Sequence, residues 1–103
     1  MAYTRKFPVE TDDMAQFPLG RIFATPGCLV ALEAAAVSAS SLLDRHASGD
    51  WGDLGIADKL ANEIALEQDT RVLSMYTLPT GARVWIIKEW DRSATTLLLP
   101  SEN

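Results

Sequence analysis

The sequence contains one cysteine, one histidine and no long hydrophobic run. Because Cys28 has no second cysteine to pair with, the class of small secreted domains stapled by intramolecular disulfides is excluded. Every apolar stretch is far shorter than the roughly 18 residues that a membrane-spanning helix needs. Arg5 and Lys6 are followed within a few residues by acidic side chains instead of the apolar segment of a secretory signal. These absences predict a cytoplasmic protein with no membrane partner.

Standard catalytic and cofactor motifs are missing from the sequence as well. It has no glycine-rich phosphate loop, no Gly-x-Ser-x-Gly elbow and no Cys-x-x-Cys pair. We therefore expect no cofactor. Cys28 begins the apolar run 28–32, which favours a buried, reduced thiol over the alternative of a reactive one.

Negative charge is concentrated in the middle of the chain, which has a net charge of -5. Residues 44–69 hold seven acids and two bases, so this block accounts for the whole net charge. Such a block repels phosphates, and direct nucleic-acid binding is therefore not expected. Two explanations of the block stay open: a solvated helix surface, or an acidic imitation of nucleic acid that occupies a DNA-binding protein.

What is present is the composition of one ordinary globular domain. The 103 residues are 48% hydrophobic and 22% charged, which is enough for one core and too little chain for two. Residues 1–18 carry two prolines and scattered aromatics without helix or strand periodicity. We expect an extended N-terminal arm over 1–18 and a single α+β domain over 19–103.

The first two thirds of that domain have helical signals. A short strand is expected at 21–25, and Thr25 followed by Pro26 is typical of a helix start, so a helix is predicted from Pro26 to about Val37. A second helix is predicted to begin with Ser40 or Ser41 as its cap and to end at Gly49.

The third predicted helix follows a turn-rich connector at 50–55. Its apolar residues recur at helical spacing and its polar residues take the other side, so an amphipathic helix with its apolar side toward the core is expected. The apolar row consists of Ile56, Leu60, Ala61, Ile64 and Ala65.

From Arg71 onward the period changes from 3.6 to 2, which is typical of strands. Three strands are predicted, at 71–78, 83–89 and 94–99, with a glycine-containing turn after the first and Pro100 ending the last. The predicted fold class is α+β: about three helices packed on one face of a small antiparallel sheet with a C-terminal three-stranded meander.

Two motifs resemble those of an uncharacterised family of small bacterial proteins, frequent in proteobacteria and often encoded on plasmids or other mobile elements. The first is His-x-x-Gly-Asp-Trp-Gly at 46–52, and the second is Asp-Arg-Ser-x-Thr-Thr-x-Leu-Leu-Pro at 91–100. The similarity runs from about Pro18 to the C-terminus. It implies a bacterial protein associated with a mobile element, and it implies no particular activity.

The first motif and the residue that directly follows it hold four candidate functional residues. His46 is the only side chain suited to a near-neutral proton shuttle, although an imidazole at a helix C-terminus also stabilises the helix dipole. Asp50 and Asp53 could join His46 around a divalent ion, but no second histidine or cysteine accompanies them, so no metal site is predicted. Trp51 is either a hydrophobic plug or an exposed binding residue.

The second group of candidates lies at the turn between the last two predicted strands: Glu89, Asp91, Arg92 and Ser93. Arg92 can pair with a neighbouring acid and Ser93 can close the turn, which would make the cluster structural. The alternative is that these residues face a ligand.

Three functions are compatible with these residues. The first is a non-enzymatic interaction module of a mobile genetic element. It would bind another protein or itself through the face that carries the Gly-Asp-Trp-Gly and Asp-Arg-Ser turns, with a homodimer as one option. The second is a ribonuclease similar in arrangement to barnase or RelE, with His46 as acid or base and Arg92 as phosphate clamp. The third is the acidic imitation of nucleic acid described above.

Overall fold

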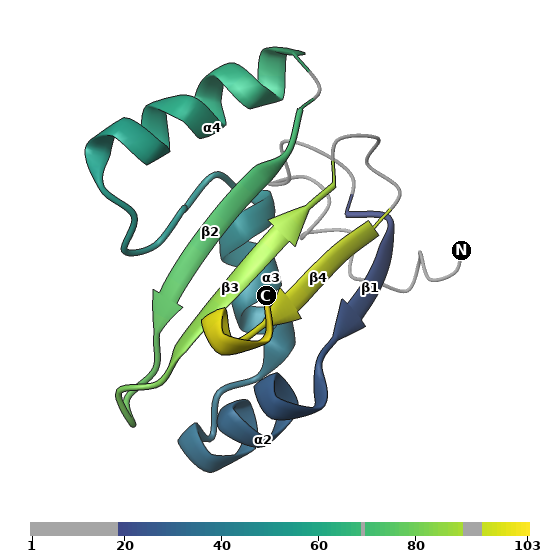
Figure 1. Cartoon of the computed structure of the whole chain (residues 1–103), viewed down its shortest axis with the longest axis vertical. Coiled ribbons are helices and arrows are strands. Elements are labelled where there is room, and N and C mark those ends of the chain that lie inside the picture. The colour runs from purple at the N-terminus through teal and green to yellow at the C-terminus, as the bar shows by residue number, and fades with distance from the viewer. Residues whose placement is uncertain (1–18, 69, 90–93) are drawn as a thin grey trace.

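The computed structural model describes residues 19–68, 70–89 and 94–103, and the arm predicted for 1–18 lies outside the described residues. The fold is α+β, as predicted, with helices α2, α3 and α4 ahead of most of the sheet (Figure 1). The elements in chain order are β1 (Arg21–Ala24), α2 (Pro26–Ala35), α3 (Ala39–Ala47), α4 (Ile56–Gln68), β2 (Val72–Thr77), β3 (Arg83–Lys88), β4 (Ala94–Leu98) and the 3₁₀ helix η1 (Pro100–Glu102).

The sheet has four strands in the order β1-β4-β3-β2. Strands β2, β3 and β4 form the predicted antiparallel meander. Strand β1 lies parallel to β4, with Arg21 opposite Ala94, so the sheet is mixed and not purely antiparallel as expected. The parallel pairing arises because the helical segment carries the chain away after β1 and the meander then returns beside it.

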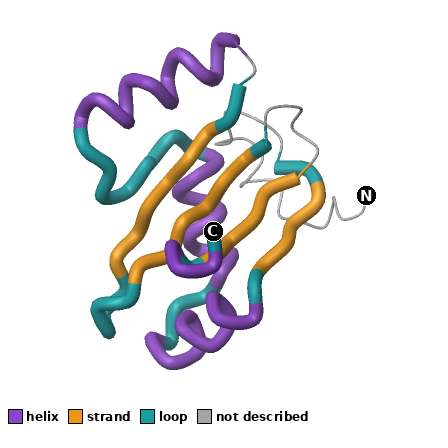
Figure 2. Tube along the Cα trace, viewed as in Figure 1, coloured by secondary structure: helices purple, strands orange, loops and turns teal. Residues whose placement is uncertain are grey.

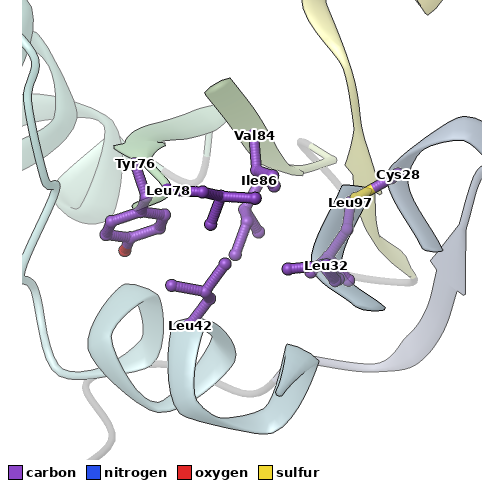
Figure 3. Packing of buried hydrophobic residues seen from close by; sticks show 8 residues of the cluster. All are labelled: Cys28, Leu32, Leu42, Tyr76, Leu78, Val84, Ile86 and Leu97. Atoms are coloured by element: carbon purple, nitrogen blue, oxygen red, sulfur yellow. The ribbon is translucent and has the colours of Figure 1, made fainter. Parts of the chain in front are cut away.

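One face of the sheet carries the main core, and strand alternation decides which side chains enter it. Val72, Ser74 and Tyr76 are all buried on this face, as the period of 2 predicts. Figure 3 shows side chains from α2 and α3 meeting side chains from the strands in this core. Its buried members are Cys28, Leu32, Leu42, Tyr76, Leu78, Val84, Ile86 and Leu97.

Helix starts follow the capping chemistry of small polar residues. Thr25 caps α2 by accepting a hydrogen bond from the Cys28 N–H, and Pro26 occupies the first turn, as predicted. The prediction for α3 was two or three residues too late, since Ser38 is the cap and accepts from the Ser41 N–H at 3.2 Å. A serine run offers several candidate caps, and the chain path from α2 decides which one is used.

Helix α4 begins at the predicted residue, but the large side chains of its apolar row face water. Asn62 and Ala65 are buried against the body of the protein, whereas Ile56, Leu60 and Ile64 are 79%, 58% and 53% exposed. The expectation that the apolar row packs on the core was therefore right for Ala65 and wrong for the three large side chains. Asn62 turns inward because its amide bonds to the backbone of β2, a pairing that hydrophobic periodicity cannot register.

The C-terminal 3₁₀ helix η1 lies on the opposite side of the sheet from α3 (Figure 2). The Glu102 carboxylate accepts hydrogen bonds from the Thr25 hydroxyl and the Gly27 N–H, and so joins the end of the chain to the start of α2. These hydrogen bonds, the one from Thr25 first, lower the pKa of Glu102. The C-terminus thereby completes the cap of α2.

None of α2, α3 or α4 is by itself long and apolar enough to cross a bilayer. Helices α2 and α3 reach that length and composition only together, and they are bent by 103° at the break between them.

Candidate functional site

The connector at 50–53, which holds the last three residues of the first motif, runs beside β2 and pairs with it through one isolated bridge. Gly52 forms a parallel bridge with Met75. The Met75 N–H donates to the Trp51 carbonyl at 3.2 Å, and the Asp53 N–H donates to the Met75 carbonyl at 2.7 Å. The motif therefore extends the sheet beyond β2.

Side chains complete the pairing of the same strand edge. The Asp53 carboxylate accepts from the Thr77 N–H at 2.9 Å. At the other end, the Asn62 amide donates to the Leu73 carbonyl at 2.6 Å and accepts from the Leu73 N–H at 3.1 Å. Exposed strand edges invite pairing with other chains, so this arrangement protects β2 from strand addition.

Gly52 must be a glycine, because any side chain at this position would clash with β2. Its φ of 76° lies in the left-handed region. A Cβ added there would stand 2.0 Å from the Met75 carbonyl oxygen and 2.7 Å from a ring carbon of Tyr76. Only glycine allows the connector to approach β2 this closely.

The Asp50 carboxylate is fixed by an ion pair and by a hydrogen bond within its own turn. Its Oδ2 lies 2.6 Å from Arg45 Nε, and its Oδ1 accepts from the Gly52 N–H at 3.1 Å. The hydrogen bond from Arg45 is the largest cause that lowers the pKa of Asp50, and the same bond raises the pKa of Arg45. The Asp50 carboxylate is thus ionised and oriented by its own chain.

Tyr76 joins this group from the sheet. Its hydroxyl donates to the Asp50 carbonyl at 2.6 Å, and the Arg45 guanidinium lies 4.5 Å from the centre of its ring. Burial raises the pKa of Tyr76 to about 12. The phenol therefore stays protonated and serves as a fixed donor to the connector.

Trp51 lies inside the protein at 3% exposure. Its indole Nε1 donates to Glu63 Oε2 at 2.8 Å, which links the connector to α4. Its ring meets the His46 ring edge to face, with centroids 5.7 Å apart. This placement fits the hydrophobic plug and does not fit an exposed binding residue.

His46 is the centre of a buried polar cluster between α3 and the sheet. The ring Nδ1 lies 2.5 Å from Ser74 Oγ, and neither side chain has any exposed surface. Burial lowers the pKa of His46 to about 3, with the positive charge of the buried Lys88 as a second cause. The imidazole is therefore neutral at physiological pH.

The His46–Ser74 pair has the hydrogen bond of an activated serine, and Ser74 is not among the predicted site residues. A substrate must reach the serine oxygen for such a pair to act as a nucleophile and base. Both residues are fully buried, so the contact instead satisfies two polar groups inside the core. Strand alternation places Ser74 on the inner face, and that was the available signal.

The second group of candidates adds no contact to this site among the described residues. Glu89 follows β3, is half-buried, and its N–H donates to the Ala94 carbonyl at 3.0 Å. The predicted turn residues Asp91, Arg92 and Ser93 lie outside the described residues. Within 19–68, 70–89 and 94–103, no group of three or more histidine, cysteine, aspartate or glutamate residues could hold a metal ion.

The sheet face opposite α3 holds a small pocket lined by Arg71, Leu73, Trp85, Ile87 and Asn103. Its volume is about 150 Å³. Pockets that enclose small-molecule ligands usually measure about 300 to 1,000 Å³, so this one is too small to indicate such a ligand.

Comparison with protein-family models, with curated proteins and with solved structures found no match to this chain. Most of the first motif is occupied with internal bonds, which leaves the outer side of α4 as the strongest candidate. Its exposed apolar row, Ile56, Leu60 and Ile64, is called the α4 ridge below.

Proposed function

We propose that this chain is a non-enzymatic protein-interaction module, an accessory protein of a mobile genetic element, which binds its partner through the α4 ridge. The observation that carries the proposal is the exposure of Ile56, Leu60 and Ile64, at 79%, 58% and 53%. Spaced four residues apart, they form one continuous row along the helix. The mobile-element setting is supported by the resemblance of the two sequence motifs.

The fold does not need this row. Helix α4 is attached to the body by its other side, where Ala65 packs with Trp51 and Val72, and Asn62 bonds to β2. Single exposed apolar residues are common on protein surfaces, but a contiguous apolar patch usually marks a contact site. An amphipathic helix that presents residues i, i+4 and i+8 is a common form of such a site.

The burial of His46 weighs against the ribonuclease alternative. A general acid or base must come within hydrogen-bond reach of the substrate, and His46 has no exposed surface. Its pKa of about 3 also leaves it without the proton that a general acid would donate at neutral pH.

Internal bonding weighs against the imitation of nucleic acid. Three carboxylates of the acidic block already have partners inside the molecule: Asp50 pairs with Arg45, Asp53 accepts from Thr77, and Glu63 accepts from Trp51. A mimic needs its carboxylates spaced and free on one surface. The acidic block serves the fold at these three positions.

Photocrosslinking in the native host tests the proposed function. A photoreactive amino acid at position 60 should give a defined protein adduct, and Ile64→Asp should abolish that adduct. The matched control places the same group at Thr80, which is exposed in the hairpin turn. Absence of an adduct from position 60, or the same adduct from position 80, would contradict binding through the α4 ridge.

A further inference from the structure

We infer that the partner of the α4 ridge is the same ridge of a second copy, in an antiparallel helix pair related by a two-fold axis through Leu60. This inference rests on the proposed function, because it names the occupant of the surface proposed there. Self-complementarity of the row and of the charges beside it carries the inference.

The ridge is symmetric about its centre. Ile56 and Ile64 lie four residues before and after Leu60 and carry the same side chain. A two-fold axis through Leu60 brings Leu60 onto Leu60 of the second copy and Ile56 onto Ile64 of the second copy. Isologous interfaces require such a patch, in which each residue meets its symmetry-related counterpart.

The charges on one flank of the ridge select the antiparallel arrangement. Lys59 and Glu63 are one helical turn apart on that flank. In an antiparallel pair, Lys59 of each copy stands opposite Glu63 of the other, which gives two ion pairs. Antiparallel helices also bring the opposite ends of their dipoles together. A parallel pair would not place these two charges opposite each other.

Glu63 keeps the capacity for that contact although it already has a partner. Its Oε2 accepts the indole N–H of Trp51. An ionised carboxylate has about four lone-pair sites on its two oxygens, so a lysine can bind it at the same time. The bond from Trp51 also fixes the carboxylate at the flank of the ridge.

The position of α4 allows a second helix to approach. Figure 1 shows α4 at the margin of the molecule, alongside β2. The buried residues Asn62 and Ala65 face the body, and the ridge lies on the other side of the helix. A partner helix can therefore pack on the ridge without any rearrangement of the fold.

The small contact area of the α4 ridge limits the affinity of the dimer. A standard stable interface uses about 20 to 30 residues from each side, and the ridge with its flank is much smaller. The expected dimer is weak and concentration-dependent, with a Kd on the order of 10 to 100 μM. The chain would be monomeric when dilute and dimeric where it is locally concentrated.

Sedimentation equilibrium from about 1 μM to 1 mM tests the dimer. We expect a monomer–dimer equilibrium that Leu60→Asp weakens at least tenfold and Lys59→Glu weakens several-fold. The matched control is Val30→Asp, because Val30 on α2 is 65% exposed and lies outside the ridge. Circular dichroism should show that all three variants keep the fold.

Disulfide trapping tests the antiparallel register. Leu60→Cys should form a dimer with itself, because both copies of this residue lie on the axis. Ile56→Cys should not, since two copies of residue 56 would stand about 12 Å apart along the pair, at 1.5 Å rise per residue. Ile56→Cys mixed with Ile64→Cys should form the mixed dimer.

Each outcome separates this inference from the proposed function. A wild-type chain that stays monomeric at 1 mM, but crosslinks to a different protein from position 60, would overturn the second copy and leave the interaction module standing. A monomer without any adduct would overturn both. Self-association that persists in Leu60→Asp, or that Val30→Asp abolishes, would place the dimer contact elsewhere.

Discussion

Two neighbouring regions of this molecule reverse the usual placement of side chains, and they do so for different reasons. Beneath the helices, five polar or charged residues are buried: His46, Asn62, Ser74, Lys88 and Thr95. On the outside of α4, three large apolar residues form the exposed α4 ridge. Polar groups are costly to bury and apolar groups are costly to leave in water, so both regions need a physical explanation.

In the buried region, hydrogen bonds within the fold explain the placement of four of the five residues. His46 contacts Ser74, Asn62 pairs with the backbone of Leu73, and the Thr95 hydroxyl donates to the Leu19 carbonyl at 2.6 Å. No contact among the described residues of the fold explains why the apolar side chains of the α4 ridge face water. The difference teaches that hydrogen bonds within the fold account for the buried polar residues they reach, whereas the ridge has its explanation only in the partner contact proposed above.

The largest expected effect is at Gly52, where the connector meets β2. Gly52→Ala should lower the free energy of unfolding by at least about 3 kcal/mol, because the new Cβ would overlap the Met75 carbonyl and Tyr76 at a positive φ. Urea denaturation measures the loss. In the control, Gly55→Ala, the Cβ meets nothing within 4 Å, and stability should change little. Equal effects at the two glycines would refute the tight approach.

The next effect is at Asn62, which places α4. Asn62→Ala should cost about 2 to 3 kcal/mol, because it leaves the Leu73 N–H and carbonyl without their amide partner. Chemical denaturation measures the unfolding free energy of Asn62→Ala. The control is Gln68→Ala, at an exposed position on the same helix. If Asn62→Leu proved as stable as wild type, polar pairing would not be what turns this side of α4 inward.

The third effect concerns pH. The folded-state pKa of His46, about 3, lies below its ordinary value of 6.5, so the unfolded chain binds more protons between these values. Stability is therefore complete above pH 6.5 and falls as the pH drops, by about 2 kcal/mol between pH 7 and pH 5. Melts across this range should show the loss in wild type, and His46→Gln should flatten it. A slope that survives the substitution would assign the titration to another group.

The smallest effect is expected on the ridge. Leu60→Gln should change the unfolding free energy of the monomer by no more than about 0.5 kcal/mol, because the side chain is 58% exposed. Thermal melts at low protein concentration, where the monomer dominates, provide the measurement. A loss of 2 kcal/mol or more would mean that the ridge stabilises the fold, and its contrast with the buried cluster would disappear.

The sequence was sufficient where backbone geometry acts over a few residues. The period of 2 from Arg71 onward predicted which strand residues are buried, including Val72 and Tyr76. Thr25 and Pro26 predicted the start of α2. These features depend on neighbours within one turn or one strand, so composition and spacing are enough to predict them.

Sequence reasoning about the candidate site was less complete. It singled out His46, Asp50, Trp51 and Asp53 but assigned no partner to them, and it passed over Asn62 and Ser74. The Asp50 carboxylate has its partners Arg45 and Gly52 within five residues, but the partners in the other side-chain hydrogen bonds lie 11 to 28 residues away along the chain. Spacing within a motif cannot show such pairings.

The chain itself thus determined its elements, their order and the inner face of each meander strand, since these follow from local sterics and hydrophobic alternation. Only the tertiary structure decided which side of α4 faces water. The unpaired edge of β2 needed donors and acceptors, Asn62 supplied both, and the helix turned its apolar row outward as a result. A hydrogen-bonding demand in a distant strand outweighed the hydrophobic pattern of the helix.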